Sequence, residues 1–452
     1  MKIVIVVMIL MQQLLIASVD KLTLDEAVNI LQKENLEIKA ATLDVKIAQE
    51  DENTVSGAHW GKLDFIQDAA RSNDAGNVFG FKLTSREATF GDFGFSEFNP
   101  ALPQDTLLKT QPNDLNYPDD RNFFQSKLRY EVPLFTGFAL SSYGDIMHSM
   151  TKMKSLEKEE LINTKIYELR KSYYSMALLE NSIINLSTIL TNIEHLQKTT
   201  QSMIDVGYAK KVDLLEVKAK KGNVERLLIQ MQSNKTLLYH YISFLLNQQV
   251  SEITVPNTEI QMPSISDENI LSSNLDIQKA STGLVIRKNM LSSEEASYYP
   301  TVGAFGEVAT ADNSFLGDAV DHSAYTVGAR LTWNIFNGGS DSAKIQKSQL
   351  ELLKMRSQVN LAKNGIRLQI AKIRTEILSA DQEIESLTKE LELAAAIYAN
   401  YEGRYREKLT SMNDVIIKQS QQIEKTLQLQ MAKNKRNEKI FALEKLANTK
   451  GL

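Results

Sequence analysis

A strand-like segment occurs twice in this chain, 201 residues apart, and this duplication constrains the fold more than any other feature. The first copy runs from Phe124 to Gly137 and the second from Tyr325 to Gly338. Apolar and polar residues alternate in both copies, which is the period of a β-strand with one apolar face. Each alternating run, of roughly 10 residues, is long enough to cross a bilayer as a tilted strand. The sequence therefore predicts two related halves with matching strands.

Each copy ends in a Phe-x-Gly motif and is followed by a long segment of helical pattern. The chain has only 8 Pro, with none between Pro133 and Pro256 or after Pro300, so long helices can run without interruption. In the second half, apolar residues spaced four and three apart predict a coiled-coil seam at Ile366, Ile370, Ile373, Ile377, Ala380, Ile384, Leu387, Leu391, Ala394 and Tyr398. The same seam recurs 201 residues earlier at Leu169, Met176, Leu179, Ile183, Leu186, Leu190 and Ile193.

A return helix follows a short turn in each half, which predicts two antiparallel helical hairpins over 138–248 and 339–448. The helix that begins near Phe138 would reach on the order of 100 Å at the usual rise per residue. A globular domain does not need a helix of this length, whereas a tube that crosses the periplasm does.

A second set of matched segments lies 239 residues apart, where Leu36-Glu-Ile-Lys corresponds to Leu275-Asp-Ile-Gln. Because this offset exceeds the first by 38, the connection between the first two strands is 38 residues longer than its counterpart. This connection, 70–122, is rich in Gly, Asn, Asp, Pro and Phe, which is typical of an exposed loop. Within it, Val78–Leu83 is expected to pair locally as a strand.

The predicted order of elements is the same in both halves. The first repeat, 19–250, is expected to hold a helix over 21–57, strands over about 59–69 and 123–135, and the first hairpin. A linker over 251–267 leads to the second repeat, 268–452, with a helix over 268–297, strands over about 299–309 and 323–336, and the second hairpin.

The N-terminus predicts a secretory signal. Lys2 precedes an apolar run that ends near Ala17 and is followed by Ser18, so we expect a cleaved segment over 1–18. About 15 apolar residues are too few for a membrane helix. No other segment approaches 18 apolar residues, so strands would have to place this protein in a membrane.

Composition argues against several classes of function. The net charge is -5 with acids and bases interspersed, which gives no sign of nucleic-acid binding. Cysteine is absent, so disulfides and thiolate metal sites are excluded. The five His are far apart in the sequence and no phosphate-binding glycine loop is present, so we expect neither an enzyme nor a cofactor or metal site.

In its order of segments the chain resembles the TolC-type outer membrane efflux proteins. The resemblance covers the mature length and includes the junction Pro133-Leu-Phe-Thr-Gly137 and the turn Val206-Gly207-Tyr208…Val212-Asp213. It implies a mainly α fold with membrane β-structure: a homotrimer in which each chain gives four strands to a 12-stranded outer-membrane β-barrel and its coiled coils to a periplasmic α-barrel. Four strands cannot close a barrel alone, which independently requires chains to combine.

The same resemblance implies a passive channel from a periplasmic adaptor and an inner-membrane pump or ABC transporter to the exterior, in tripartite efflux or type I secretion. The cargo stays open among drugs, metal ions and polypeptides. The rival interpretation is a non-channel periplasmic coiled-coil scaffold or adaptor, which would lack paired alternating strands.

Candidate sites follow from the resemblance at the helical turns. Asp213 and Asp414, with Glu216 and Tyr405, are expected to form the periplasmic aperture gate, where three copies of each acid would attract cations. The alternative is that both acids only cap helices, Asp414 through the capping box Ser411-Met-Asn-Asp414.

Adaptor binding is expected at the helical tips, at Val206, Gly207, Tyr208, Lys408 and Leu409. Lys408 stands where the family pattern has Gly, so a turn of different shape or with strain is predicted there. The acid Glu216 has Ile417 as its counterpart, a second departure between the halves.

The strands carry the remaining candidates. Trp60 and Trp333 are expected in an aromatic belt at the membrane interface, with core packing as the alternative. Arg129 and Arg330 occupy the polar parity and are expected to face the lumen, unless pairing with Glu131 is their whole role.

Overall fold

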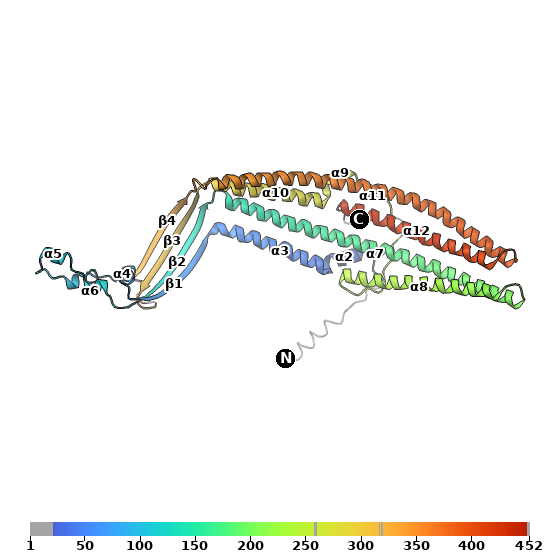
Figure 1. Cartoon of the computed structure of the whole chain (residues 1–452), viewed down its shortest axis with the longest axis horizontal. Helices are drawn as coiled ribbons and strands as arrows, with labels where there is room; N and C mark the ends of the chain where they lie inside the picture. Colours follow the sequence, from blue (N-terminus) through green and yellow to red (C-terminus); the bar gives the residue numbers. More distant parts are fainter. Residues whose placement is uncertain (1–20, 257–259, 316, 318–319, 450–452) are drawn as a thin grey trace, which may run out of the picture. The chain divides into compact units, whose positions relative to one another are not determined.

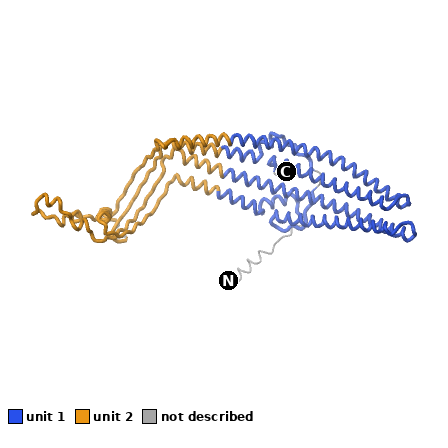
Figure 2. The backbone as a smooth tube through the Cα atoms, in the orientation of Figure 1, with its two compact units in different colours: residues 1–47, 151–284, 355–452 blue, residues 48–150, 285–354 orange. Residues whose placement is uncertain are grey.

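A computed structural model describes residues 21–256, 260–315, 317 and 320–449 of the chain. The expected signal segment 1–18 lies outside the described residues, as does part of the linker 251–267. The chain divides into two compact units (Figure 2). Unit 1 combines Met1–Ile47, Thr151–Leu284 and Met355–Leu452, and unit 2 combines Ala48–Met150 and Val285–Lys354.

Unit 2 contains a four-stranded antiparallel sheet in the order β1-β2-β3-β4 (Figure 1). The strands are β1 (Lys62–Ser72), β2 (Arg121–Phe135), β3 (Thr301–Asp312) and β4 (Ser323–Thr332). All four predicted strands are present, but β4 ends at Thr332 rather than at 336. The reason is its partner: Thr332 pairs with Thr301, the first residue of β3, so the chain beyond Thr332 has no neighbour in the ladder.

The connection from β1 to β2 is 38 residues longer than that from β3 to β4, as the offsets predict. It is not structureless, because it holds α4 (Ala75–Thr84), η2 (Gly91–Phe93), η3 (Phe95–Glu97), α5 (Gln104–Leu107) and α6 (Asn113–Asn116). The expected strand pairing of Val78–Leu83 is wrong, since these residues lie in α4. A local cap decides this: the Asp74 side chain accepts a hydrogen bond from the Asn77 amide and so starts the helix.

Sharp joints connect the strands to helices through left-handed backbone. Gly61 (φ 71°) precedes β1, and Gly137 (φ 63°) follows β2. A side chain at Gly137 would put Cβ 2.7 Å from the carbonyl oxygen of Ala296, and one at Gly61 would put it 2.0 Å from that of Glu131. These two positions therefore need glycine for space as well as for conformation.

Two helical hairpins make up most of unit 1. They are α7 (Ala139–Asp205) with α8 (Lys211–Leu246), and α11 (Ser340–Arg406) with α12 (Met412–Leu446); α7 and α11 have 67 residues each and begin in unit 2. The predicted seam is the buried side: Leu169, Met176, Ile370 and Ile377 are all fully covered. No described helix is both long and apolar enough to cross a lipid bilayer.

Each predicted leading helix is in fact two helices. The breaks separate α2 (Leu24–Glu34) from α3 (Leu36–Gly57) and α9 (Asp267–Ser273) from α10 (Leu275–Glu295), at Asn35 and Asn274. Both Asn side chains cap the following helix and also donate a hydrogen bond to a return helix: Asn35 to the carbonyl of Leu245 (2.8 Å) and Asn274 to that of Leu446 (3.1 Å). The expected helices 21–57 and 268–297 are corrected accordingly.

Four apolar clusters lie among the described residues of unit 1, and the smallest joins Leu387 of α11 to Leu429 and Ala432 of α12. One joins α2, α7 and α8, and another joins α9, α10, α11 and α12. The third lies near the turns and combines side chains of α7, α8, α11 and α12, so the two hairpins are packed against each other there. Within the first core, Leu22 forms a parallel bridge with Ile253 of the linker.

Candidate channel wall and helical tips

The sheet of unit 2 has one apolar and one charged face. Cross-strand register places Leu63 beside Tyr130, Phe65 beside Leu128, and Val308 beside Tyr325. The apolar face is exposed in this chain, at Leu63, Phe65, Leu128, Tyr130, Val308, Tyr325, Val327 and Leu331. Val327, in the middle of β4, exposes 77% of its surface. A soluble chain seldom leaves so large an apolar patch in water, so this face needs a covering such as lipid.

The opposite face carries a network of charges. Arg129 forms an ion pair with Glu131 (2.5 Å) and stands opposite Glu307 in the ladder. Arg129, Glu131 and Arg330 line one depression of about 550 Å³ on this face. The structure thus brings the two predicted arginines together on the polar side, and pairing with Glu131 accounts for part of the role of Arg129.

Both tryptophans lie on the surface beside the ends of the sheet. Trp60 is in η1 (Ala58–Trp60), before β1, and is 80% exposed; Trp333 directly follows β4 and is 55% exposed. The Trp333 indole donates a hydrogen bond to the carbonyl of Tyr298, and the carbonyl of Trp60 accepts one from the Tyr130 hydroxyl. The alternative of core packing is therefore wrong for the single chain, and amphipathic rings at this edge suit an interface.

The two helical turns have the same backbone design. After α7, Gly207 has φ 82° and the Tyr208 amide donates to the carbonyl of Met203; after α11, Lys408 has φ 59° and the Leu409 amide donates to that of Arg404. This is the left-handed helix termination that normally uses glycine. The sequence predicted a turn of different shape or with strain, and the second alternative is the one found, because Lys408 holds a left-handed conformation that is costly for a residue with Cβ.

Lys408 also links the two turns. Its Nζ lies 3.4 Å from the centroid of the Tyr208 ring, which is a cation–π contact between the tips of the two hairpins. Val206, Tyr208 and Leu409 are each about two-thirds exposed. The predicted adaptor residues therefore gather at one surface with exposed apolar side chains. Val212 and Leu215 are also exposed there and were missed in the sequence, since they resemble ordinary seam residues.

Asp213 and Asp414 both cap the return helices. Asp213 accepts a hydrogen bond from the Lys210 amide (2.9 Å). Asp414 accepts bonds from the Ser411 hydroxyl (2.6 Å) and the Thr410 hydroxyl (3.1 Å), and these bonds lower the pKa of Asp414 below its ordinary value. The capping geometry is thus present at both positions.

Tyr405 connects the gate candidates across the two hairpins. It is buried at the end of α11, in the core that includes Val217 of α8 and Met412 of α12. Burial raises the pKa of the Tyr405 phenol, Thr200 partly offsets this rise, and the charge of Asp213 adds to it. The Tyr405 phenol therefore feels the charge of Asp213, while Glu216 is half-buried further along α8.

Known proteins show where such a fold occurs. Residues 268–449 match the model of the family described as outer membrane efflux protein. The second half of the chain is thus similar to outer membrane efflux proteins. This family consists of channels rather than enzymes, and it confirms the resemblance seen in the sequence. No curated protein sequence matches the chain.

The fold extends this likeness over nearly the whole chain. CusC, whose crystal structures concern transmembrane channel formation, has a TM-score of 0.78 at 12% identity, covering 94% of this chain and 91% of that one. The outer membrane channel CmeC of Campylobacter jejuni has a TM-score of 0.75 at 13% identity, and the match covers 95% of this chain and 86% of that one. The outer membrane protein VceC of Vibrio cholerae has a TM-score of 0.75 at 14% identity, and the match covers 94% of this chain and 96% of that one. The chain therefore shares its mainly helical fold, with the small sheet, with these solved structures.

Proposed function

We propose that three chains assemble into an outer-membrane channel that passively conducts substrates to the exterior from a periplasmic adaptor and an inner-membrane pump or ABC transporter. The observation that carries this proposal is the two-faced sheet. Its apolar face is exposed, its charged face suits a water-filled lumen, and β1 and β4 each have a single neighbouring strand among the described residues.

In a lipid bilayer, the two edge strands β1 and β4 require the chain to assemble with others. An unpaired backbone group costs several kcal/mol in a hydrocarbon environment, so β1 and β4 must find partners there. Pairing β4 of one chain with β1 of the next satisfies both edges at once, and the family resemblance sets the number of chains at three. In this assembly Arg129 and Arg330 face the lumen, while Trp60 and Trp333 lie at the membrane interface.

The rival function, a periplasmic scaffold or adaptor without a channel, does not use this sheet. Such a protein would expose the apolar face to water, with nothing to cover it. The number of chains separates the two proposals. Mass measurement of the detergent-solubilised protein should give a trimer that conducts ions in planar bilayers. A stable, non-conducting monomer would refute the channel.

The two helical turns carry the other sites of the proposed function, adaptor docking and the aperture gate. We assign adaptor docking to the exposed tip residues Val206, Gly207, Tyr208, Lys408 and Leu409. The aperture gate is assigned to Asp213, Asp414, Glu216 and Tyr405. Three copies of each acidic side chain, brought together at a narrow aperture, would attract cations and favour their passage or block.

The gate is tested by neutralising both acids, Asp213→Asn with Asp414→Asn. A side-chain amide can still cap a helix, so assembly should be retained. Cation selectivity and block by divalent cations in planar-bilayer recordings should weaken. If the double variant forms trimers whose selectivity and block match the parent, then both acids are helix caps and nothing more.

A further inference from the structure

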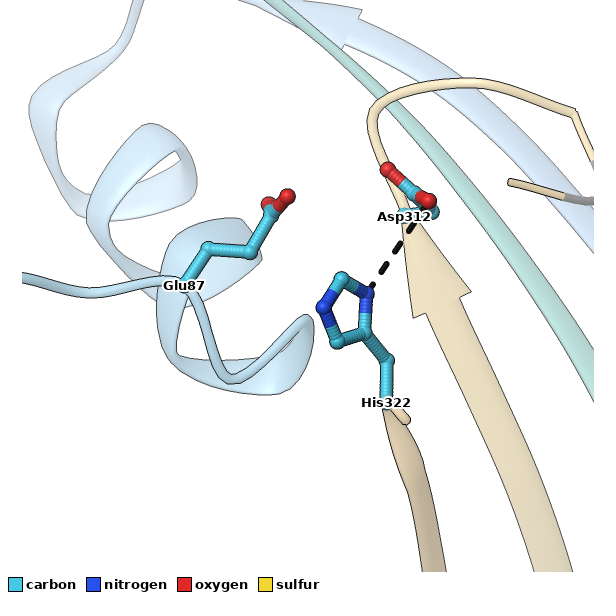
Figure 3. Close-up of side chains that lie close together, drawn as sticks. All are labelled: Glu87, Asp312 and His322. Atoms are coloured by element: carbon cyan, nitrogen blue, oxygen red, sulfur yellow. Dashed lines mark ion pairs between the residues drawn. The ribbon is translucent and has the colours of Figure 1, made fainter. Parts of the chain in front are cut away.

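Three side chains that can ligate a metal converge in unit 2, away from the residues used above (Figure 3). Glu87 comes from the connection after α4, Asp312 from the last position of β3, and His322 from the residue before β4. One ligand atom from each lies within 4.8 Å of the others. More than two hundred residues of sequence separate Glu87 from the other two, which is why sequence patterns alone do not predict the group.

The imidazole of His322 has a ring nitrogen that is available to bind a metal. Its Nδ1 is buried and has no hydrogen-bond partner among the described residues, and it lies 3.9 Å from Oδ2 of Asp312, beyond hydrogen-bond length. A buried nitrogen without a partner is costly, and the side chain of His322 is 16% exposed. A cation between the nitrogen and the carboxylate would give this nitrogen a partner.

Asp312 is held ready by its own loop. Its Oδ1 lies 2.5 Å from the Asn313 amide and 3.4 Å from the Ser314 amide, which both donate to it, and this directs Oδ2 toward His322. The side chain of Asp312 is 11% exposed. A carboxylate that is already oriented by hydrogen bonds loses little freedom on binding a metal, as in protein metal sites generally.

Arg121 lies beside this group in the described part of the chain, so it competes with a metal for the two carboxylates. It forms an ion pair with Oε2 of Glu87 and is close enough to Asp312 for their charges to attract. Two carboxylates and one guanidinium leave a net charge of one negative before any metal binds. Arg121 therefore fixes Glu87 without neutralising the group, which is how an outer partner of a ligating carboxylate acts.

We propose that Glu87, Asp312 and His322 bind a divalent cation of the Zn²⁺ type and so tie the β1–β2 connection to the β3–β4 turn. One imidazole and two carboxylates are ligands that Zn²⁺ accepts. At bond lengths of about 2.0–2.2 Å, the ligand atoms of a tetrahedral site lie about 3.4 Å apart, so the side chains close in by about an ångström on binding.

The test is Zn²⁺ binding to the full chain in detergent, without an affinity tag and after treatment with a chelator. Calorimetry should give one Zn²⁺ per chain. Co²⁺ as a probe should show the visible absorption of a tetrahedral site with a nitrogen ligand. His322→Gln should weaken binding at least tenfold, since loss of even an outer partner costs 10- to 100-fold. Glu87→Gln provides a second variant that leaves the Asp312 turn intact.

His148→Gln is the matched control, because His148 also lies in unit 2 beside an acid, Glu52, but is exposed and has one such neighbour (3.0 Å). It should bind as the parent does. Zn²⁺ should also slow proteolysis of the 73–120 connection in the parent and not in His322→Gln. Absence of Zn²⁺ binding by the parent, or equal binding by the parent and His322→Gln, would refute the metal site. Neither result bears on the proposed trimer or its conductance.

Discussion

Two neighbouring residues of β4 provide a direct test of which sheet face meets lipid. Val327 lies in the middle of the strand on the apolar face, and Thr326 points to the charged face opposite Glu307. Both are exposed in the single chain, so neither is needed for its internal packing. Val327→Lys and Thr326→Lys therefore introduce the same charge one residue apart, on opposite faces of the same strand.

The expected magnitudes differ widely. A Lys on the lipid face near the bilayer midplane costs about 2–4 kcal/mol, which is a roughly 30- to 700-fold change in the folding equilibrium. Lys at position 326 stands across from the carboxylate of Glu307, and such cross-strand pairs are worth about 0.2–1 kcal/mol. Thr326→Lys should accordingly be neutral or slightly stabilising.

The assay is refolding from urea into lipid vesicles, followed by gel migration without heating, which separates folded trimer from unfolded chain. Val327→Ala serves as the control for lost apolar surface, and it should cost far less than Val327→Lys. If both Lys variants refold equally well, or if Thr326→Lys is the damaging one, then the apolar face does not meet lipid and the channel wall is assigned wrongly.

The remaining predictions concern the helices. Asn274→Ala should cost about 1–3 kcal/mol, because it leaves the buried carbonyl of Leu446 without its donor, and amide exchange at the end of α12 should quicken. Lys408→Gly should change stability little, because the relief of about 1 kcal/mol of backbone strain offsets the loss of a cation–π contact worth about 0.5–1 kcal/mol. Tyr208→Leu loses the contact without relieving the strain, so amide hydrogen exchange at the turn should be faster in this variant than in Lys408→Gly. Hydrogen bonds from Ser411 and Thr410 lower the pKa of Asp414 below its ordinary value of 3.8. The stability that this cap contributes is therefore fully present above pH 3.8 and is lost as the pH falls through the lowered pKa. The NMR signal of the Asp414 amide should report this loss.

Periodicity predicts those parts of this fold that depend on one face being buried or covered. The alternation in β2 and β4 fixes which side chains share a face, and the register of the sheet then joins them across strands. The seam of α7 and α11 is predicted for the same reason, because a spacing of four and three leaves one side of the helix to pack.

Long-range contacts explain the helix breaks that were missed. Nothing in the local pattern separates Asn35 or Asn274 from an exposed helical position. Each break is instead decided by a carbonyl about two hundred residues away, at Leu245 and Leu446, which only the folded chain brings near. The helix α4 was missed for the opposite reason, since the local cap at Asp74 outweighs an alternating pattern.

The duplication separates what holds the fold from what distinguishes the halves. The Asn that caps a helix and binds a return helix occurs in both repeats, as do the seam and the left-handed termination of the long helix. Such repeated features need only stability to explain them. Features present once need another cause: the long β1–β2 connection with Glu87, Lys408 in place of Gly, and Glu216 against Ile417. Because Lys408 keeps a strained backbone where its counterpart Gly207 has none, and places its charge on the ring of Tyr208, its side chain contributes something that the termination itself does not require. That contribution is a contact between the two tips, at a position where the two halves of this chain differ in sequence.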